Sequence, residues 1–260
     1  MKKGCITVAI LALVALVLLL TFALESNTPT PVTLPTPNAY DVLVAAGSQI
    51  VDMPDDYAET EDTTRLASFL EKNSQALNSL DNIHKLDCVV VYDRSAGLDA
   101  VLAKTMPESS SIRQAMRLLF AQARLAELQG NQTEAAKRYA KLFAIATKSA
   151  NQGLLVDNLQ SMAIERQALN QLANIVEKLS GDEKLEVLAI IETSNRGPRD
   201  LDAIVDREHN LVRNQHGRLS GNWMIRLTKS SQQEQHERFR QTDEGIVRLL
   251  KFVIDETKRQ

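Results

Sequence analysis

The sequence contains few of the residues that form disulfide frameworks and zinc sites. It has two cysteines in 260 residues, Cys5 in an apolar N-terminal run and Cys88 in the body of the chain. The two cannot pair if the N-terminal run lies in a membrane, and no spacing typical of zinc ligands is present. Cys88 falls in the apolar run DCVVVYD, where we expect a small buried hydrophobic residue rather than a reactive thiol.

Aromatic residues, glycine and proline are also scarce, which argues against a strand-rich fold. Aromatic residues make up 4% of the chain, whereas apolar residues as a whole make up 44%. A core built mainly from Leu, Ala, Ile and Val suits helices packed on helices better than a sheet sandwich. The ten glycines and seven prolines are few for the many turns of an all-β fold. The composition therefore predicts an all-α protein.

The chain has no excess of positive charge, which disfavours nucleic acid as a partner. Its net charge is −3, so no general basic field is available to attract phosphates. The negative charge is concentrated between Asp41 and Ala100, where twelve acidic and four basic residues give a local charge of −8. Two interpretations of this segment remain open: a solvated acidic rim, or a docking surface for a basic partner.

An uninterrupted apolar run at the N-terminus predicts a membrane anchor. Residues 5–24 carry no charge, and as a helix they would extend about 30 Å, the thickness of the hydrocarbon core of a bilayer. A cleaved signal peptide has a shorter apolar run and a cleavage site with small residues, and the sequence TFALES (21–26) offers a poor site. We therefore expect an uncleaved signal anchor, and secretion after cleavage is the alternative.

The residues on either side of the apolar run predict the topology. Lys2 and Lys3 precede it, which places the N-terminus in the cytoplasm and the body outside it. The following TPTPVTLPTPN is an extended spacer, because proline disfavours helix in the residue before it. We expect a cytoplasmic stub at 1–4, a transmembrane anchor at 5–24, a Pro/Thr-rich spacer at 25–37 and a helical extracytoplasmic domain at 38–260. The lysine-led anchor and the disulfide-free body are typical of a bacterial periplasmic or envelope protein.

Apolar residues recur with helical spacing through most of the body. Residues 154–179 are apolar on much of the helix circumference and are the candidate for the central buried helix. Ser180 and Glu183 form a capping-box pattern at the start of another helix. The expected helices are 38–53, 64–86, 111–129, 133–149, 154–179, 180–192, 198–216 and 242–258. Residues 218–231 are expected to be irregular or a broken helix. Short links between these helices predict an antiparallel bundle or a short helical stack.

One hairpin in this series resembles a known repeat. In ARLAELQGNQTEAAKRYAKLFAIA (123–146), Gly130 separates two helical segments, and Ala135 and Tyr139 follow as a small and an aromatic residue. The stretch resembles a tetratricopeptide repeat, which implies a helix–turn–helix of repeat-like geometry. Leu142 and Thr147 depart from the repeat pattern, and no second copy occurs at a ~34-residue period. We interpret the hairpin as core packing, with a degenerate repeat platform for a partner as the alternative.

One group of titratable residues could carry chemistry. Glu208 lies inside the apolar stripe of the helix expected at 198–216, where a carboxylate is costly unless it is paired or protonated. The structural interpretation is a buried ion pair between Glu208 and an arginine. The functional alternative makes Glu208 a general acid or base, with His209 and His216 as a second titrating group or as metal ligands. Their spacing matches no strong metal motif, and we expect no metal site.

The sequence predicts an interaction protein rather than an enzyme. Phosphate-binding loops, the nucleophile elbow and the His-Glu-x-x-His zinc motif are all absent. We expect a membrane-anchored helical scaffold or protein-interaction module with no catalytic activity and no cofactor, whose partners are the membrane and another protein. Trp223, the one tryptophan, is a packing anchor or a candidate partner contact. The alternative is an envelope hydrolase or metal-dependent enzyme that uses Glu208 with His209 and His216. Nothing indicates an oligomeric state.

Overall fold

Helices are the regular elements of the computed structural model over the residues that it describes, 32–194 and 196–258, and no strand occurs in these two ranges. The expected all-α class is confirmed. The helices are α2 (Ala39–Gly47), α3 (Thr63–Lys72), α4 (Ser74–Leu80), η1 (Ile83–Lys85), α5 (Leu98–Leu128), α6 (Gln132–Ser149), α7 (Leu155–Val176), α8 (Gly181–Glu192), α9 (Leu201–His216) and α10 (Arg218–Lys258).

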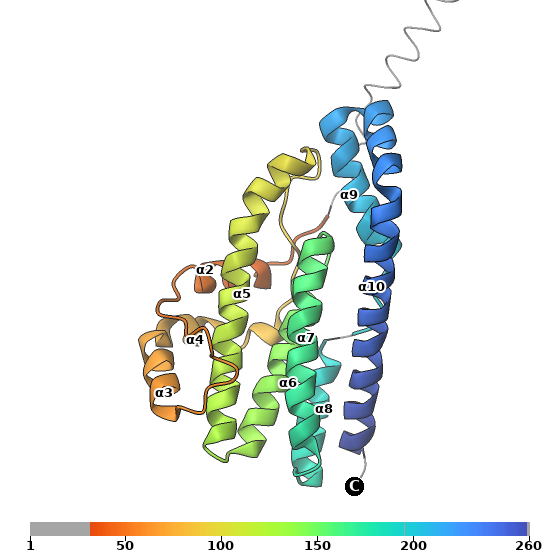
Figure 1. Ribbon diagram of the computed structural model, residues 1–260. Helices are drawn as coiled ribbons and strands as arrows, with labels where there is room; N and C mark the ends of the chain where they lie inside the picture. The colour runs from red at the N-terminus through yellow and green to blue at the C-terminus, as the bar shows by residue number, and fades with distance from the viewer. Residues whose placement is uncertain (1–31, 195, 259–260) are drawn as a thin grey trace, which may run out of the picture.

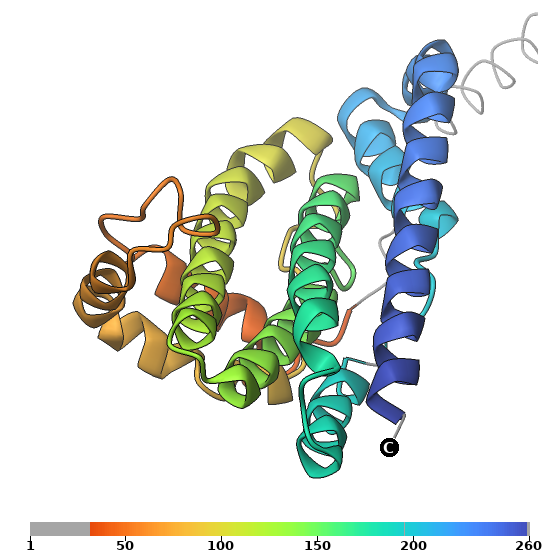
Figure 2. The same ribbon diagram turned by 60° about the horizontal axis from the view of Figure 1, so that its bottom comes forward.

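Two antiparallel hairpins, α5–α6 and α7–α8, form the middle of the molecule. α6 packs against α5, α7 and α8, and α7 packs in turn against α10. Helices α3 and α4 lie on one side of this centre, while α10 runs along the opposite side with α9 packed against it (Figures 1 and 2). The central position expected for 154–179 is therefore shared with α6. Ten of the eighteen residues of α6 are buried, against nine of the twenty-two in α7.

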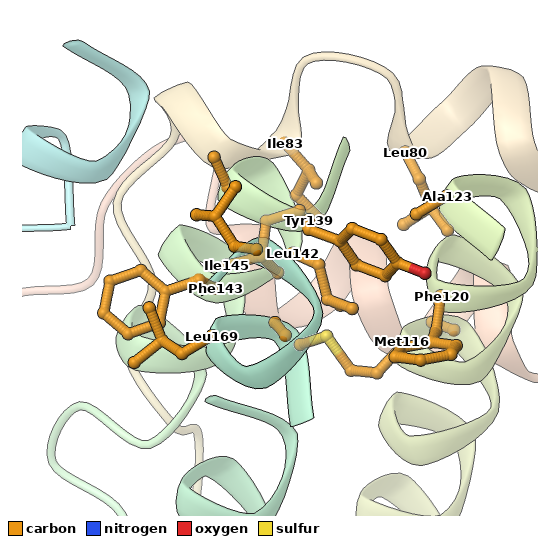
Figure 3. Packing of buried hydrophobic residues seen from close by; sticks show 14 of the residues in the cluster. Leu80, Ile83, Met116, Phe120, Ala123, Tyr139, Leu142, Phe143, Ile145 and Leu169 are labelled. Atoms are coloured by element: carbon orange, nitrogen blue, oxygen red, sulfur yellow. The ribbon is translucent and has the colours of Figure 1, made fainter. Parts of the chain in front are cut away.

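The main core lies around α6 and is built from aliphatic residues with a few aromatic rings. Tyr139 and Phe143 of α6 are fully buried, and Phe120 of α5 meets the Tyr139 ring at a centroid distance of 5.3 Å (Figure 3). Leu142 and Ile145 continue the packing toward Leu80 and Ile83. The composition had indicated such a core, in which small and branched side chains let the helices approach closely.

Several helix boundaries follow the signals in the sequence. The Asn38 side chain accepts a hydrogen bond from the backbone N–H of Tyr40 at 3.2 Å and so caps α2 as expected. The predicted capping-box pair at α8 also meets, since the backbone N–H of Ser180 donates to Oε2 of Glu183 at 2.8 Å. DCVVVYD is neither helix nor strand, and Cys88 within it is buried.

The helix expected at 64–86 is divided because Asn73 binds a distant loop. Its Nδ2 donates to the carbonyl of Val51 at 3.0 Å, and its Oδ1 accepts from the N–H of Val51 at 2.9 Å. Helix α2 ends at Gly47 rather than at residue 53, and these bonds pair the backbone N–H and carbonyl of Val51 in the segment that follows it. A side chain that bonds the backbone competes with helix continuation, which explains the break between α3 and α4.

Helix α2 crosses α5 in unusually close contact at Gly47. A Cβ atom added to Gly47 would lie 1.8 Å from the carbonyl oxygen of Ser111 and 2.4 Å from its carbonyl carbon. Only a residue without a side chain fits between the two backbones. Nearby, the Tyr40 hydroxyl donates to Oε2 of Glu108 at 2.8 Å and joins the same two helices.

Two long helices extend beyond their predicted limits. α5 begins at Leu98 rather than at 111 and continues through Pro107. Its first turns are held by a small second core in which Val101 packs with Leu154 and Leu211. α10 is continuous from 218, so the prediction that 218–231 is irregular or a broken helix is wrong. Packing against α9 outweighs the weak helix propensity of this stretch, and Asn222 accepts a hydrogen bond from Nε of Arg213 at 2.8 Å.

The predicted anchor at 5–24 and most of the spacer at 25–37 lie outside the described residues. Over 32–194 and 196–258, no helix combines the length and the apolar character needed to cross a membrane.

Candidate functional site

Glu208, the main candidate from the sequence, lies against the N-terminus of α7. Its Oε1 accepts a hydrogen bond from the backbone N–H of Leu155 at 2.9 Å. Burial raises the pKa of the Glu208 carboxyl, while this hydrogen bond acts in the opposite direction. Among the described side chains, no ion pair within 4.0 Å includes Glu208. Its observed partner is therefore a helix N-terminus, which binds a carboxylate through its unpaired backbone N–H groups.

The two histidines do not join Glu208 in a metal site. His216 is exposed at the end of α9, and His209 is half-buried one residue after Glu208. Over the described ranges, no group of three or more His, Cys, Asp and Glu side chains could hold a metal ion. Among the described residues, Glu208, His209 and His216 are therefore not assembled as the metal ligands that the metal-dependent enzyme alternative requires.

Replacing Glu208 separates its capping role from a charge-dependent one. Glu208→Gln keeps an oxygen acceptor for the Leu155 N–H, so we expect the free energy of unfolding at pH 7 to change by less than about 1 kcal/mol. Glu208→Ala removes the acceptor and should cost about 1–2 kcal/mol. Urea unfolding of both variants measures the difference. A loss for Gln as large as that for Ala would show that the fold depends on the negative charge of Glu208 rather than on its acceptor oxygen.

A buried cluster of four charged side chains, which was not predicted from the sequence, lies between α7, the 196–200 segment and α10. Oε2 of Glu165 lies 3.1 Å from Nε of Arg196, and its Oε1 lies 2.6 Å from Nη2 of Arg199. Asp243 of α10 pairs with Nη2 of Arg196, and its Oδ2 accepts from the backbone N–H of Arg199 at 3.0 Å. The four side chains are between 0% and 9% exposed.

Two carboxylates balance two guanidinium groups in this cluster, which points to a structural role. Arg199 also donates to Oγ of Ser161 at 2.6 Å, and Ser161 in turn donates to the carbonyl of Ala146 on α6. The arginines line a polar cleft of about 620 Å³, but their charge is already neutralised by Glu165 and Asp243. We interpret the cluster as a structural ion-pair network that connects α6, α7 and α10 through the 196–200 segment.

The sequence did contain a signal for this cluster. Glu165 lies three residues after Met162 and four before Leu169, so it occupies the apolar stripe of α7, just as Glu208 was placed in the stripe of its own helix. The same cost of burying an unpaired carboxylate applies to both positions. The ion pair predicted for Glu208 is not formed among the described side chains, and a buried carboxylate–arginine pair is formed instead by Glu165, which was not predicted.

A second buried group, His84, makes stability depend on pH. His84 is 4% exposed, and its Nδ1 is buried with no hydrogen-bond partner in the described part of the chain. Burial, together with the positive charges of Lys141, Lys85 and Lys148, lowers its pKa to about 4. The unfolded chain, with a His pKa of about 6.5, binds the proton more readily than the folded chain does.

Stability will therefore fall as the pH decreases from 6.5 toward 4, because protonation of His84 favours the unfolded state. The loss assigned to this group should reach about 2–3 kcal/mol at pH 4.5. Urea unfolding at pH 7 and at pH 4.5 should show that His84→Gln reduces the difference between the two pH values by that amount. An unchanged difference would mean that His84 is protonated without cost in the folded state.

The three hairpin residues lie in the core at the α5–α6 turn. Gly130 has φ +78°, a left-handed conformation that suits glycine after a helix end. Ala135 and Tyr139 are both fully buried, and the Tyr139 hydroxyl donates to Oε2 of Glu127 at 2.9 Å. The interpretation of this hairpin as core packing agrees with this burial.

An apolar groove lies between α5 and α7, and it shares no lining residue with the polar cleft. α5 and α7 lie on either side of α6 and make few direct contacts with each other (Figure 1). The groove has a volume of about 440 Å³. Its lining residues are Tyr57, Arg113, Met116, Arg117, Phe120, Val156, Leu159, Gln160, Ala163, Ile164 and Gln167.

The groove has a buried aromatic floor and an exposed leucine on its α7 wall. Phe120 is 1% exposed, and Tyr57 meets its ring edge-on at 5.7 Å from the loop before α3. Leu159, expected from the sequence to face the core, is 46% exposed instead. Gln160 joins the two walls, because its Nε2 donates to the carbonyl of Ser109 at 3.1 Å. The second apolar face of α7 thus lines this groove.

Trp223, the candidate partner contact, lies in helix α10 and not in a loop as expected, and its side chain is outside the described part of the structure. No protein family, curated protein or solved structure matches this chain.

Proposed function

We propose that this protein is a membrane-anchored helical interaction module, which binds a segment of another protein in the groove between α5 and α7. The observation that carries the proposal is the exposed Leu159 beside the apolar floor of Met116 and Phe120. In this proposal, the apolar run at 5–24 holds the domain at the membrane and the Pro/Thr-rich spacer sets its distance from the surface.

The distribution of apolar residues on α7 supports a binding face. Met162, Leu169 and Leu172 of this helix are buried in the main core. Leu159 lies on the other face, where no element of the described structure covers it, while Val156, which also lines the groove, packs partly against the small second core. An exposed apolar side chain beside a concave apolar surface is typical of helix-in-groove recognition.

Photo-crosslinking at the groove tests this function. Leu159→p-benzoylphenylalanine in the full-length chain should form a discrete crosslinked product with another protein in cells of the native host. Leu185 of α8 is 50% exposed and lies outside the groove, so Leu185→p-benzoylphenylalanine is the matched control. Identical products at both positions, or no product at position 159, would contradict the proposal.

A further inference from the structure

We propose that the groove binds an amphipathic helix whose apolar face is flanked by carboxylates. This inference rests on the proposed function and adds the chemistry of the partner. It comes from the charges around the groove: its lining residues include two arginines and no acidic residue.

The two arginines lie one turn apart on the α5 wall. Arg113 and Arg117 are four residues apart, so they lie on the same face of the helix. Among the described side chains, neither forms an ion pair within 4.0 Å. Both guanidinium groups therefore remain available to a carboxylate of a partner, to which arginine can donate two parallel hydrogen bonds.

Arg117 is positioned by an aromatic ring. Its guanidinium carbon lies 5.5 Å from the centroid of the Tyr57 ring, which in turn packs on Phe120. The contact holds the charge at the edge of the apolar floor without neutralising it. Asp56, which precedes Tyr57, is paired with Arg65 of α3 and does not compensate Arg117.

The shape of the groove favours a helix over a lipid surface. A cavity of about 440 Å³ between two helices can be filled by side chains that project from a third helix. A flat bilayer could reach Leu159 and Arg113 on the walls but not the floor between them. The α7 wall supplies neutral amides, Gln160 and Gln167, so only the α5 side of the partner needs acidic residues.

A selection from a library of random 16-residue peptides displayed on phage tests the inference. The target is the full-length chain in phosphatidylcholine nanodiscs, with Leu159→Asp selected in parallel to identify peptides that depend on the groove. We expect the groove-dependent peptides to carry apolar residues at i, i+3 and i+7 and to be enriched in Asp and Glu beside them. Their binding should weaken as salt increases.

Charge reversal gives the decisive comparison. Arg113→Glu with Arg117→Glu should weaken binding of the selected peptides about tenfold or more, whereas Arg113→Lys with Arg117→Lys should retain most of it. The matched control is Arg248→Glu with Lys251→Glu on α10, which changes the net charge equally at exposed positions outside the groove and should leave binding unchanged.

The possible outcomes separate the inference from the proposed function. Groove-dependent peptides that are neutral or basic, or that tolerate the charge reversal at Arg113 and Arg117, would overturn the inference and leave the interaction module standing. The absence of any peptide that depends on Leu159 would overturn both. Binding of phosphatidylglycerol vesicles by the chain in phosphatidylcholine nanodiscs, lost on Arg113→Glu with Arg117→Glu, would show that anionic lipid is the ligand, which would also overturn the inference.

Discussion

Glu165→Gln is expected to lower the free energy of unfolding by about 3–5 kcal/mol, the usual cost of breaking a buried ion pair on one side. The substitution keeps the shape of the side chain but leaves Arg196 and Arg199 with Asp243 as their one acidic partner in the cluster. Because the Glu165 side chain is 0% exposed and Arg196 only 2%, water cannot solvate the positive charge that is left without a partner. Such a loss is a large share of the stability of an ordinary domain, about 5–15 kcal/mol.

Urea unfolding followed by circular dichroism measures this effect. Glu177→Gln, at the exposed end of the same helix, is the matched control and should change stability by less than about 0.5 kcal/mol. Adding Arg199→Met to Glu165→Gln should recover part of the loss, because it removes the uncompensated charge. A change in the free energy of unfolding below about 1 kcal/mol for Glu165→Gln alone would mean that the ion-pair network does not stabilise the fold as its geometry indicates.

Gly47→Ala is the second change with a large expected effect. The new methyl group would lie 1.8 Å from the carbonyl oxygen of Ser111, and the obstacle is the backbone of α5 rather than a flexible side chain. Helix α2 must then move away from α5 and lose the hydrogen bond between Tyr40 and Glu108. We expect a loss of about 3 kcal/mol or more, at the upper end for overpacking, although alanine has the higher intrinsic helix propensity.

Gly181→Ala provides the control for this prediction. It is also a glycine in a helix, at the start of α8, but a Cβ atom there meets nothing within 4 Å. We expect it to be neutral or stabilising by up to about 1 kcal/mol. Hydrogen exchange should show faster exchange in α2 of the Gly47→Ala variant while α6 remains protected. Equal stability of the two variants would mean that α2 is free to shift on α5.

Interactions between residues close together in the sequence could be predicted, and interactions between distant residues could not. Asn38 and Ser180 cap their helices through contacts within three residues, and the helix types of α6 and α7 follow from apolar spacing. Distant partners caused the errors. Asn73 ends α3 because it binds Val51. Helix α5 begins earlier than predicted because Val101 packs in the small second core.

The sequence indicated that a carboxylate in an apolar stripe needs a partner, but it did not indicate which residues meet. The cost of a buried carboxylate led to the prediction of an ion pair at Glu208, which the described structure does not contain. Which carboxylate meets an arginine depends on how α7, the 196–200 segment and α10 come together. The surplus of apolar residues on α7 was visible in the sequence and was interpreted as complete burial. Distinguishing a buried face from the wall of a groove requires knowledge of which neighbour covers it, and Leu159 has none among the described elements.

The location of Asp243 has a consequence for biogenesis. Glu165 lies in the middle of the chain, and Asp243 lies near its carboxyl end. A nascent chain on the ribosome that has not yet emerged past α9 therefore carries two arginines for a single carboxylate. The second half of the domain should consequently stay open to chaperones and proteases until α10 has emerged, and it should then close in a single step rather than in stages.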